Sequence, residues 1–356
     1  MPRIALIIVT YNSEKFLPEL LLSLKKMKQP EGWVQIIIVD NASSDGTVAY
    51  LTAANRDQVY GQGIALPVQI VSQTQNLGFS VAVNAGIRSS HDAEYIALLN
   101  PDTVVTEDWL TELVQALDTD NTIASAQPLL LYNQNRGVIN SSGNAIHFLG
   151  FGFTFGNGTK LTTNNLQLKT DIAYASGAAV LYRKKYLEEI ALFDEDLFMY
   201  HDDLDVGWKF ILRGYINVLV PTSIVYHHYE FSRSIQKYYW MERNRLMILF
   251  THYRYRTLLL ILPALFVLEL GLTLFSIIRG FFMSRLRAYM WLFQHSALIL
   301  RKHRTLQQLR AVGDHVIMGK FTGIISHQEI SNPVVEWVMN PLFSLYLTVI
   351  KSLIPW

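Results

Sequence analysis

Runs of aliphatic residues alternate with amphipathic segments along roughly the first 120 residues of the chain. Apolar runs of strand length occupy residues 4–9, 35–39, 67–72 and 95–99. Such continuous runs are typical of strands that are buried on both faces of a parallel sheet. Residues 15–28 and 80–89 instead place apolar side chains at helical spacing. The alternation predicts an α/β fold with a Rossmann-like, mostly parallel sheet flanked by helices.

The middle of the chain has a weaker pattern. Residues 127–171 are rich in Gly, Asn and Thr with interleaved aromatic residues, which predicts hairpins or mobile loops over a site. Residues 175–182 predict a further strand and residues 184–189 a short helix. An acidic cluster at 202–205 then leads into a helix, and a strand is expected over 216–220.

The hydropathy changes after residue 237. Residues 258–278 are almost wholly apolar, interrupted only by Pro263 and Glu269, and could span a bilayer core of roughly 30 Å. A carboxylate in mid-membrane is costly, which argues against a simple crossing. Both flanks are basic, through Arg254, Arg256, Arg279, Arg285, Arg287 and the cluster 301–304. This symmetry favours a Pro-kinked re-entrant or interfacial helix at an anionic leaflet.

A buried dimerisation helix is the alternative for the same segment, so a homo-oligomer remains open. A second apolar stretch, residues 341–356, ends the chain. We therefore divide the chain into a catalytic domain, residues 1–236, and a helical, hydrophobic, membrane-associated C-terminal region, residues 237–356.

Composition supports this division. Half of the residues are hydrophobic and 17% are charged, against about 25% in ordinary soluble domains. The net charge of +1 gives no reason to expect nucleic acid as a partner. The chain has no cysteine, which excludes disulfides, thiolate metal sites and a cysteine nucleophile. The apolar run at 4–9 is too short for a signal peptide, so the catalytic part is expected in the cytoplasm.

Polar residues follow the predicted strands at Thr10-Tyr11-Asn12, Asp40-Asn41 and Asn100-Pro101-Asp102. Ligands of open α/β sheets bind at the carboxyl ends of the strands, so these clusters should converge on one crevice. A carboxylate there can accept from a nucleobase or ribose, and Tyr11 offers a ring for stacking. Asp40 is favoured for such a contact, whereas Asp45 could equally cap the next helix.

These segments, together with the stretch from Asn76 to Gly86, resemble family 2 inverting glycosyltransferases of the GT-A fold, in particular rhamnosyltransferase-like members. The resemblance covers about residues 4–250. It implies contacts to a nucleotide-sugar donor from Thr10, Tyr11, Asn12, Asp40, Asn76, Asn84 and Asn100. Turn formation and helix capping are the alternative roles of Asn76 and Asn84.

The resemblance also implies a metal site. Asn100-Pro101-Asp102 stands where the family commonly has a metal-binding Asp-x-Asp, so Asp102 is the remaining carboxylate. Oxygen ligands suit Mg²⁺ or Mn²⁺, which would neutralise the charge of a diphosphate leaving group. His227 is the expected second ligand, with His228 as the alternative.

The acidic cluster resembles the segment of the family that carries the catalytic base. Inverting transfer needs one base to remove the proton of the acceptor hydroxyl, and by position this is Asp203, assisted by Asp202. Closely spaced carboxylates raise one another's pKa. Acceptor or diphosphate contacts are expected from Asp205, Ser232 and Arg233, although Asp205 might cap its helix. Lys237, Arg243 and Arg245 could meet diphosphate or lipid headgroups.

The implied function is transfer of a sugar from a nucleotide-sugar donor, with dTDP-rhamnose as one candidate, to a lipid-linked or polysaccharide acceptor. The location would be the cytoplasmic face of the cell membrane, with membrane lipids as further partners. A nucleotidyltransferase would carry a Gly-rich diphosphate loop near the N-terminus, which is missing. A catalytically impaired membrane scaffold that binds nucleotide sugars is the non-enzymatic alternative, supported by Asn100.

Overall fold

The computed structural model describes residues 3–30, 32–56, 68–162, 171–229, 238–325 and 333–356. The chain forms two compact units. The sheet unit comprises residues 1–144, 154–210 and 215–229, and the helical unit comprises residues 145–153, 211–214 and 230–356. The second unit thus includes two short segments from within the sequence that we assigned to the catalytic domain. The functional boundary at 236/237 stays a prediction.

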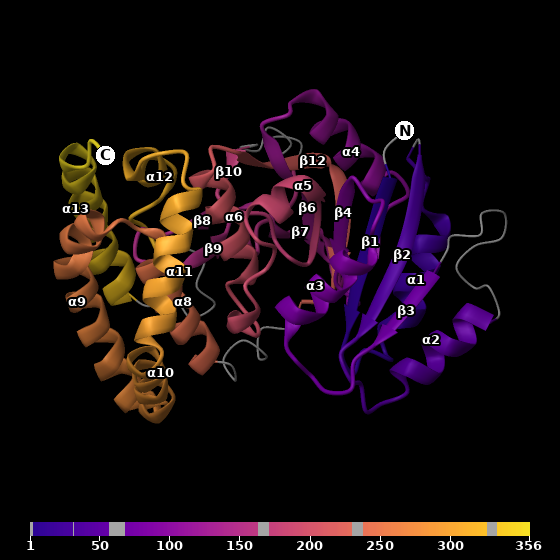
Figure 1. Cartoon of the computed structure of the whole chain (residues 1–356), viewed down its shortest axis with the longest axis horizontal. Helices are drawn as coiled ribbons and strands as arrows, with labels where there is room; N and C mark the ends of the chain where they lie inside the picture. Colours follow the sequence, from indigo (N-terminus) through magenta and orange to yellow (C-terminus); the bar gives the residue numbers. More distant parts are fainter. Residues whose placement is uncertain (1–2, 31, 57–67, 163–170, 230–237, 326–332) are drawn as a thin grey trace. The chain divides into compact units, whose positions relative to one another are not determined.

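The sheet unit is built on a ten-stranded sheet with the order β10-β12-β6-β11-β4-β1-β2-β3, with β5 beside β12 and β7 beside β6 (Figure 1). Its strands are β1 (Arg3–Thr10), β2 (Trp33–Asp40), β3 (Val68–Ser72), β4 (Tyr95–Leu99), β5 (Thr103–Val105), β6 (Ile123–Tyr132), β7 (Asn135–Ser141), β10 (Asp171–Ile172), β11 (Ala179–Arg183) and β12 (Ile216–His227). Strands β3, β2, β1, β4, β6 and β12 run in one direction, while β11 and β10 oppose them. The prediction of a mostly parallel sheet is therefore confirmed.

Helices cover both faces of this sheet. One face packs against α1 (Leu17–Lys26), α2 (Thr47–Arg56) and α4 (Trp109–Thr119). The other face packs against α3 (Phe79–Ser89), α5 (Lys184–Glu189) and α6 (Asp202–Leu212). Because both faces are covered, the central strands are buried along their length and appear in the sequence as continuous aliphatic runs.

Two predictions for the middle of the chain are corrected. Residues 127–132 belong to the long central strand β6, and β8 (Asn144–Ile146) pairs with β9 (Gly152–Thr154) in a hairpin. Phe148 and Leu149 between them are fully buried, so this part does not form mobile loops. The Gly and Asn pattern reflects tight turns with positive φ, at Gly143 and Gly150. The strand expected over 175–182 is only β11, which begins at Ala179 and runs antiparallel.

The helical unit contains α8 (Tyr238–His252), α9 (Tyr255–Arg279), α10 (Phe282–Gln294), α11 (Ser296–Leu309), α12 (Asp314–Lys320) and α13 (Asn340–Leu353), with a π-helical turn, η3 (Val335–Met339), and a 3₁₀ turn, η2 (Glu195–Leu197), in the sheet unit. Helix α9 continues through Pro263 and ends at Gly280, whose left-handed φ of 79° closes the helix. Among the described helices, α9 alone is long and apolar enough to cross a bilayer.

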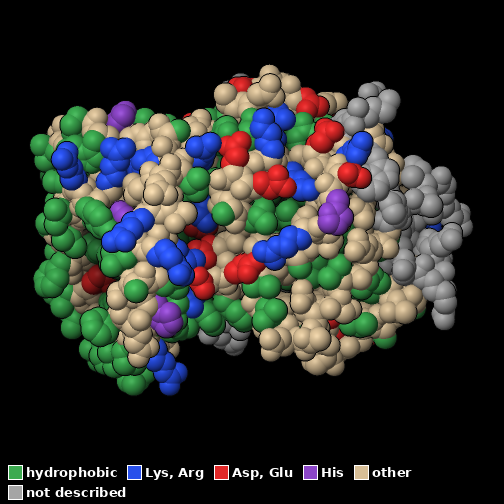
Figure 2. Space-filling view, viewed as in Figure 1, with side chains coloured by type: hydrophobic (Ala, Val, Ile, Leu, Met, Phe, Trp, Pro, Cys, Tyr) green, Lys and Arg blue, Asp and Glu red, His purple; other side chains and the backbone are tan. Residues whose placement is uncertain are grey.

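The face of α9 that points away from its neighbours is apolar. Its buried stripe includes Ile261, Leu265 and Leu268. A second stripe is exposed and consists of Leu259, Leu262, Phe266, Val267, Leu270, Leu274, Ile277 and Ile278. Hydrophobic side chains gather over this part of the helical unit, at the left of Figure 2. Helix α13 adds Leu342, Leu345, Val349 and Leu353. Exposed apolar surface of this extent marks a protein or membrane contact.

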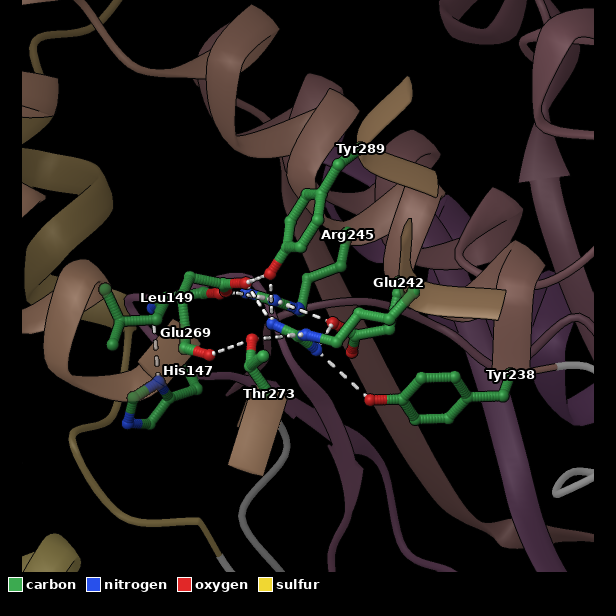
Figure 3. A network of polar contacts seen from close by, with 9 residues as sticks. His147, Leu149, Tyr238, Glu242, Arg245, Glu269, Thr273 and Tyr289 are labelled. Carbon is green, nitrogen blue, oxygen red and sulfur yellow. Dashed lines mark hydrogen bonds and ion pairs between the residues drawn. The ribbon is translucent and has the colours of Figure 1, made fainter. Parts of the chain in front are cut away.

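The charges that the sequence places within or beside α9 point inward and are paired (Figure 3). Glu269 lies 2.5 Å from Arg245 and also pairs with Arg285, while Glu242 lies 3.0 Å from Arg245 and 2.5 Å from Arg285. The hydroxyls of Tyr238 and Tyr289 complete this cluster, which we call the arginine–glutamate network.

The network corrects three expectations. Arg245 and Arg285 are at most 1% exposed, so neither is a surface cation that meets diphosphate or lipid. Arg243 is also buried, against the rings of Trp240 and Trp291. Glu269 is not an isolated carboxylate in an apolar helix, because two guanidinium groups compensate its charge. The cost that we assigned to it in a membrane is therefore much reduced.

Candidate active site

The first two strands end in one hydrogen-bonded cluster. Thr10 and Asp40 are partners in the β1–β2 register, and the Thr10 hydroxyl donates to Asp40 Oδ1 over 3.0 Å. Asp40 also accepts from the Ser43 hydroxyl at 2.5 Å and from its backbone N–H at 3.0 Å. Both Thr10 and Asp40 are buried. The structure brings them together as expected, in a cluster that also fixes the turn after β2.

Tyr11 and Asn12 lie at the edge of this cluster. Half of Tyr11 is exposed, so its ring is available to a ligand. Asn12 has a positive φ of 51°, and its side-chain oxygen accepts from the backbone N–H of Ser44 at 2.8 Å. Asp45 accepts from the backbone N–H of Thr47 at 3.0 Å at the start of α2. Of the two roles considered for Asp45, helix capping is the one that the contacts show.

Asn41 joins the second strand end to the loop before α3, and sequence reasoning did not single it out. Its amide nitrogen donates to Asn76 Oδ1 at 3.0 Å, and its amide oxygen accepts from the Leu77 N–H at 3.1 Å. Asn76 also accepts from the Gly78 N–H at 3.0 Å, which is the turn contact considered as its alternative role. The only signal for Asn41 in the sequence was its place directly after Asp40.

Asn84 ties α3 to the segment before the acidic helix. Its amide nitrogen donates to the Phe193 carbonyl at 2.9 Å and to Glu195 at 3.0 Å, and its oxygen accepts from the Phe193 N–H at 3.1 Å. The side chain is 1% exposed. These contacts position the chain, and a direct nucleotide contact from Asn84 stays a prediction.

The loop that leads into α6 is conformationally constrained. Phe198, Tyr200 and His201 all have positive φ values near 64°, which residues with a Cβ rarely adopt. The Phe198 carbonyl accepts from the Phe79 N–H at 2.6 Å, and any Cβ at Gly78 would collide with that carbonyl. The glycine of the Asn76–Gly78 loop is thus required for close packing against this segment, and strained backbone of this kind clusters at functional sites.

Asp203 follows directly and lies beside a second glycine. The Gly177 N–H donates to Asp203 Oδ2 at 3.2 Å, and the Leu204 N–H donates to Oδ1 at 2.8 Å. Asn100 reaches the same place, because its N–H donates to the carbonyl of Ala178 at 2.9 Å. The segments around Asn76, Asn100, Gly177 and Asp203 are therefore contiguous.

Asp202 and Asp203 form a coupled pair of carboxyl groups at the start of α6. Burial raises the pKa of Asp202 strongly, and the neighbouring Asp203 raises it further. Burial also raises the pKa of Asp203, which is the more exposed of the two. Among the described residues, neither carboxyl forms an ion pair with Lys, Arg or His. Asp205 differs, because it is buried and lies 2.5 Å from Lys209 one helical turn on. Its contact with an acceptor or diphosphate stays a prediction.

The two expected metal ligands meet at the far end of β12. His227 is paired with Thr103 across β12 and β5, and its Nε2 lies 3.5 Å from Asp102 Oδ1. The Nδ1 of His227 donates to Asn140 Oδ1 at 2.9 Å, which leaves the Nε2 lone pair directed at Asp102. Within the described ranges, no group of three or more His, Cys, Asp or Glu forms a metal cluster.

His228 has other partners. Its Nε2 lies 2.8 Å from Glu19 and 2.7 Å from the amide nitrogen of Asn133. The geometry thus groups His227, and not His228, with Asp102. Ser232, Arg233 and Lys237 lie outside the described residues.

The sequence profile described as Glycosyl transferase family 2 matches residues 5–191, more than half of the chain, including every strand-end cluster described above up to Gly177. The chain belongs to glycosyl transferase family 2. Its fold, strand-end ligand cluster and acidic helix are thus those of a glycosyltransferase scaffold.

Curated relatives are more distant. The chain is 25% identical over 239 residues to an N-acetylglucosaminyl-diphospho-decaprenol L-rhamnosyltransferase of Mycobacterium tuberculosis, covering 62% of this chain and 74% of that protein. It is 24% identical over 214 residues to a poly-beta-1,6-N-acetyl-D-glucosamine synthase of Staphylococcus aureus, covering 60% and 46%. An uncharacterised protein of Sinorhizobium fredii is 27% identical over 213 residues, covering 57% and only 22% of its length.

Solved glycosyltransferases share the fold. A mannosyltransferase of Pyrobaculum calidifontis in complex with GDP-Man and Mn²⁺ covers 99% of this chain and 87% of its own, at 16% identity and a TM-score of 0.51. GalNAc-T7 with UDP, GalNAc and Mn²⁺ covers 72% and 49%, at 16% identity and a TM-score of 0.57. At this identity the similarity establishes the fold alone, and it agrees with the GT-A architecture expected from the sequence.

Proposed function

We propose that this family 2 glycosyltransferase transfers a sugar from a nucleotide-sugar donor with inversion, and that Asp203 is the catalytic base. The observation that carries the proposal is the pair Asp202–Asp203, held by a strained loop against Gly78 and Gly177. A base works best with a pKa near the working pH, and burial moves both carboxyls in that direction.

In the proposed step, Asp203 accepts the proton of the acceptor hydroxyl as its oxygen attacks the anomeric carbon. The bond from that carbon to the diphosphate oxygen breaks at the same time, so the nucleoside diphosphate leaves with the electron pair. The N–H groups of Gly177 and Leu204 fix the orientation of the carboxylate. Asp202 is buried deeper, and its proposed part is to hold a proton and to adjust the pKa of Asp203.

Asp102 and His227 fit a divalent cation, because a carboxylate oxygen and an imidazole lone pair face one another with the other ring nitrogen fixed by Asn140. Mg²⁺ or Mn²⁺ held there would offset the charge of the leaving diphosphate. Thr10, Tyr11, Asn12, Asp40 and Asn76 are proposed for the nucleoside, with the exposed ring of Tyr11 against the base.

For the donor and acceptor, the rhamnosyltransferase relative supports dTDP-rhamnose and a lipid-linked acceptor as the first candidates. The helical unit supports location at the cytoplasmic face of a membrane. It exposes apolar stripes on α9 and α13, and residues 237–356 contain 14 Lys and Arg against 5 Asp and Glu, although the whole chain has 30 and 29. This excess of positive charge suits an anionic leaflet.

The test is to measure transfer and donor binding in Asp203→Asn, with dTDP-, UDP- and GDP-sugars and with Mg²⁺ or Mn²⁺. Loss of a general base should slow transfer by about 10²–10⁴-fold while donor affinity is retained. Asp92→Asn, an exposed aspartate, is the matched control and should retain full activity. Equal turnover in Asp203→Asn would remove the assignment of the base. Donor binding without any transfer in the wild type would favour the scaffold reading instead.

A further inference from the structure

A groove of about 460 Å³ opens on the helical unit at the N-terminal end of α9. Its lining residues come from the start of α9 and from one face of α11: Arg254, Tyr255, His303, Arg304, Gln307 and Gln308. The rings of Tyr255 and His303 stack within it, with centroids 4.2 Å apart and an interplanar angle of 26°. Neither the proposed transfer nor its donor site uses these residues.

The framework of the groove is fixed from below. His303 is 4% exposed, and its Nδ1 lies 3.0 Å from the carbonyl of Phe250. The amide nitrogen of Gln307 donates to the carbonyls of Thr251 and His252 at the end of α8, over 3.3 and 3.1 Å. These buried contacts mean that the groove is held open by α8 and α11 and is not a gap between loose side chains.

The groove carries uncompensated positive charge. Asp314, the nearest buried carboxylate, is engaged by Arg310 at 2.5 Å, by the Thr257 hydroxyl at 2.5 Å and by the backbone N–H of Arg254 at 3.0 Å. Its charge is therefore balanced by Arg310. The side chains of Arg254 and Arg304 form no ion pair with a described carboxylate. Two guanidinium groups beside the positive end of a long helix favour a phosphate group.

The surroundings indicate where that phosphate comes from. Tyr255 is 54% exposed, and one helical turn further along α9 begins the exposed apolar stripe, at Leu259. A tyrosine between basic and apolar surface is the arrangement found at a membrane–water interface. A soluble phosphate would need no apolar stripe beside its site. We propose that the groove binds the phosphate of an anionic membrane lipid, with Arg254 and Arg304 as the cationic groups and the acyl chains against the stripe of α9.

This inference rests on the membrane location proposed above, and its test uses neither donor nor acceptor. The full chain is sedimented with vesicles of phosphatidylcholine alone or with 30% phosphatidylglycerol, a composition chosen to be roughly as anionic as a bacterial leaflet. Arg254→Gln/Arg304→Gln should weaken binding to the anionic vesicles at least tenfold. The charge-matched control is Arg287→Gln/Arg301→Gln, two exposed arginines outside the groove, which should weaken binding less than threefold.

Equal losses in the two double variants would show a general charge effect and would overturn the site. An unchanged affinity in Arg254→Gln/Arg304→Gln would do the same. Inorganic phosphate separates the two sources: a thermal shift with millimolar phosphate, combined with equal binding to both kinds of vesicle, would assign the groove to a soluble anion and contradict the lipid. Because donor binding to Asp203→Asn is measured separately, failure here leaves the assignment of the transferase intact.

Discussion

Each unit of this glycosyltransferase buries a group of carboxylates, but their surroundings have opposite charge. In the sheet unit, Asp202 and Asp203 are neighbours at the start of α6, and no described Lys, Arg or His pairs with them. In the helical unit, Glu242 and Glu269 are both held between Arg245 and Arg285. Burial raises the pKa of Asp202. Burial also acts to raise the pKa of Glu242, but the two arginines outweigh it and lower that pKa.

The difference separates function from architecture. Carboxylates that bring their own cations stay ionised and fasten helices together, as the arginine–glutamate network does for α8, α9 and α10. Carboxylates without cations hold protons more tightly and stay able to exchange them near neutral pH, which suits a base. The first group should therefore fail by losing stability when it is altered, and the second by losing activity.

The largest effect on stability is expected from Arg285→Met. This change leaves Glu242 and Glu269 with Arg245 as their only arginine, and removing one partner of a buried ion pair costs about 3–5 kcal/mol. Thermal unfolding in detergent, followed by tryptophan fluorescence, measures the loss. Arg287→Met changes an exposed arginine on the same helix and should cost less than about 0.5 kcal/mol. If both variants unfold together with the wild type, the network does not stabilise the helical unit.

A smaller effect of opposite sign is expected from Asp202→Asn. The folded pKa of Asp202 is raised to about 8, so the folded state binds its proton more tightly than the unfolded state does. Its ionisation therefore destabilises the protein increasingly as the pH rises from about 4 to 8. Asp202→Asn should raise stability by about 2 kcal/mol at pH 8 and by almost nothing at pH 4.

Glu242→Gln is the counterpart with the reverse sign. The folded pKa of Glu242 is lowered, so its stabilising contribution is present above its unfolded pKa and is lost as the pH falls through the folded value. Glu242→Gln should therefore destabilise at pH 8, with a smaller difference in acid. Equal signs for Asp202→Asn and Glu242→Gln at pH 8 would break the comparison.

The sequence predicted the parallel strands well because burial on both faces demands unbroken aliphatic runs, as in residues 4–9 and 35–39. It also predicted the pairing of Asp102 with His227, since the ends of neighbouring strands meet at one edge. It failed for Arg245, Glu269 and Arg285, because long-range ion pairs leave no periodic trace. The Asp205–Lys209 pair, in contrast, lies at a helical spacing of four and could have been found.

The comparison also implies that the sheet unit receives its cation from outside the chain, which gives the last and smallest prediction. If Asp102 and His227 hold a divalent ion, His227→Ala should raise the Mn²⁺ concentration for half-maximal transfer about tenfold, equivalent to about 1.4 kcal/mol. His228→Ala is the matched control, because His228 binds Glu19 and Asn133 instead, and it should change that concentration less than twofold. Metal titration of the transfer rate measures both. A larger effect at His228, or the same effect at both, would exclude His227 as the metal ligand, and a wild type that is fully active in chelator would remove the metal site altogether.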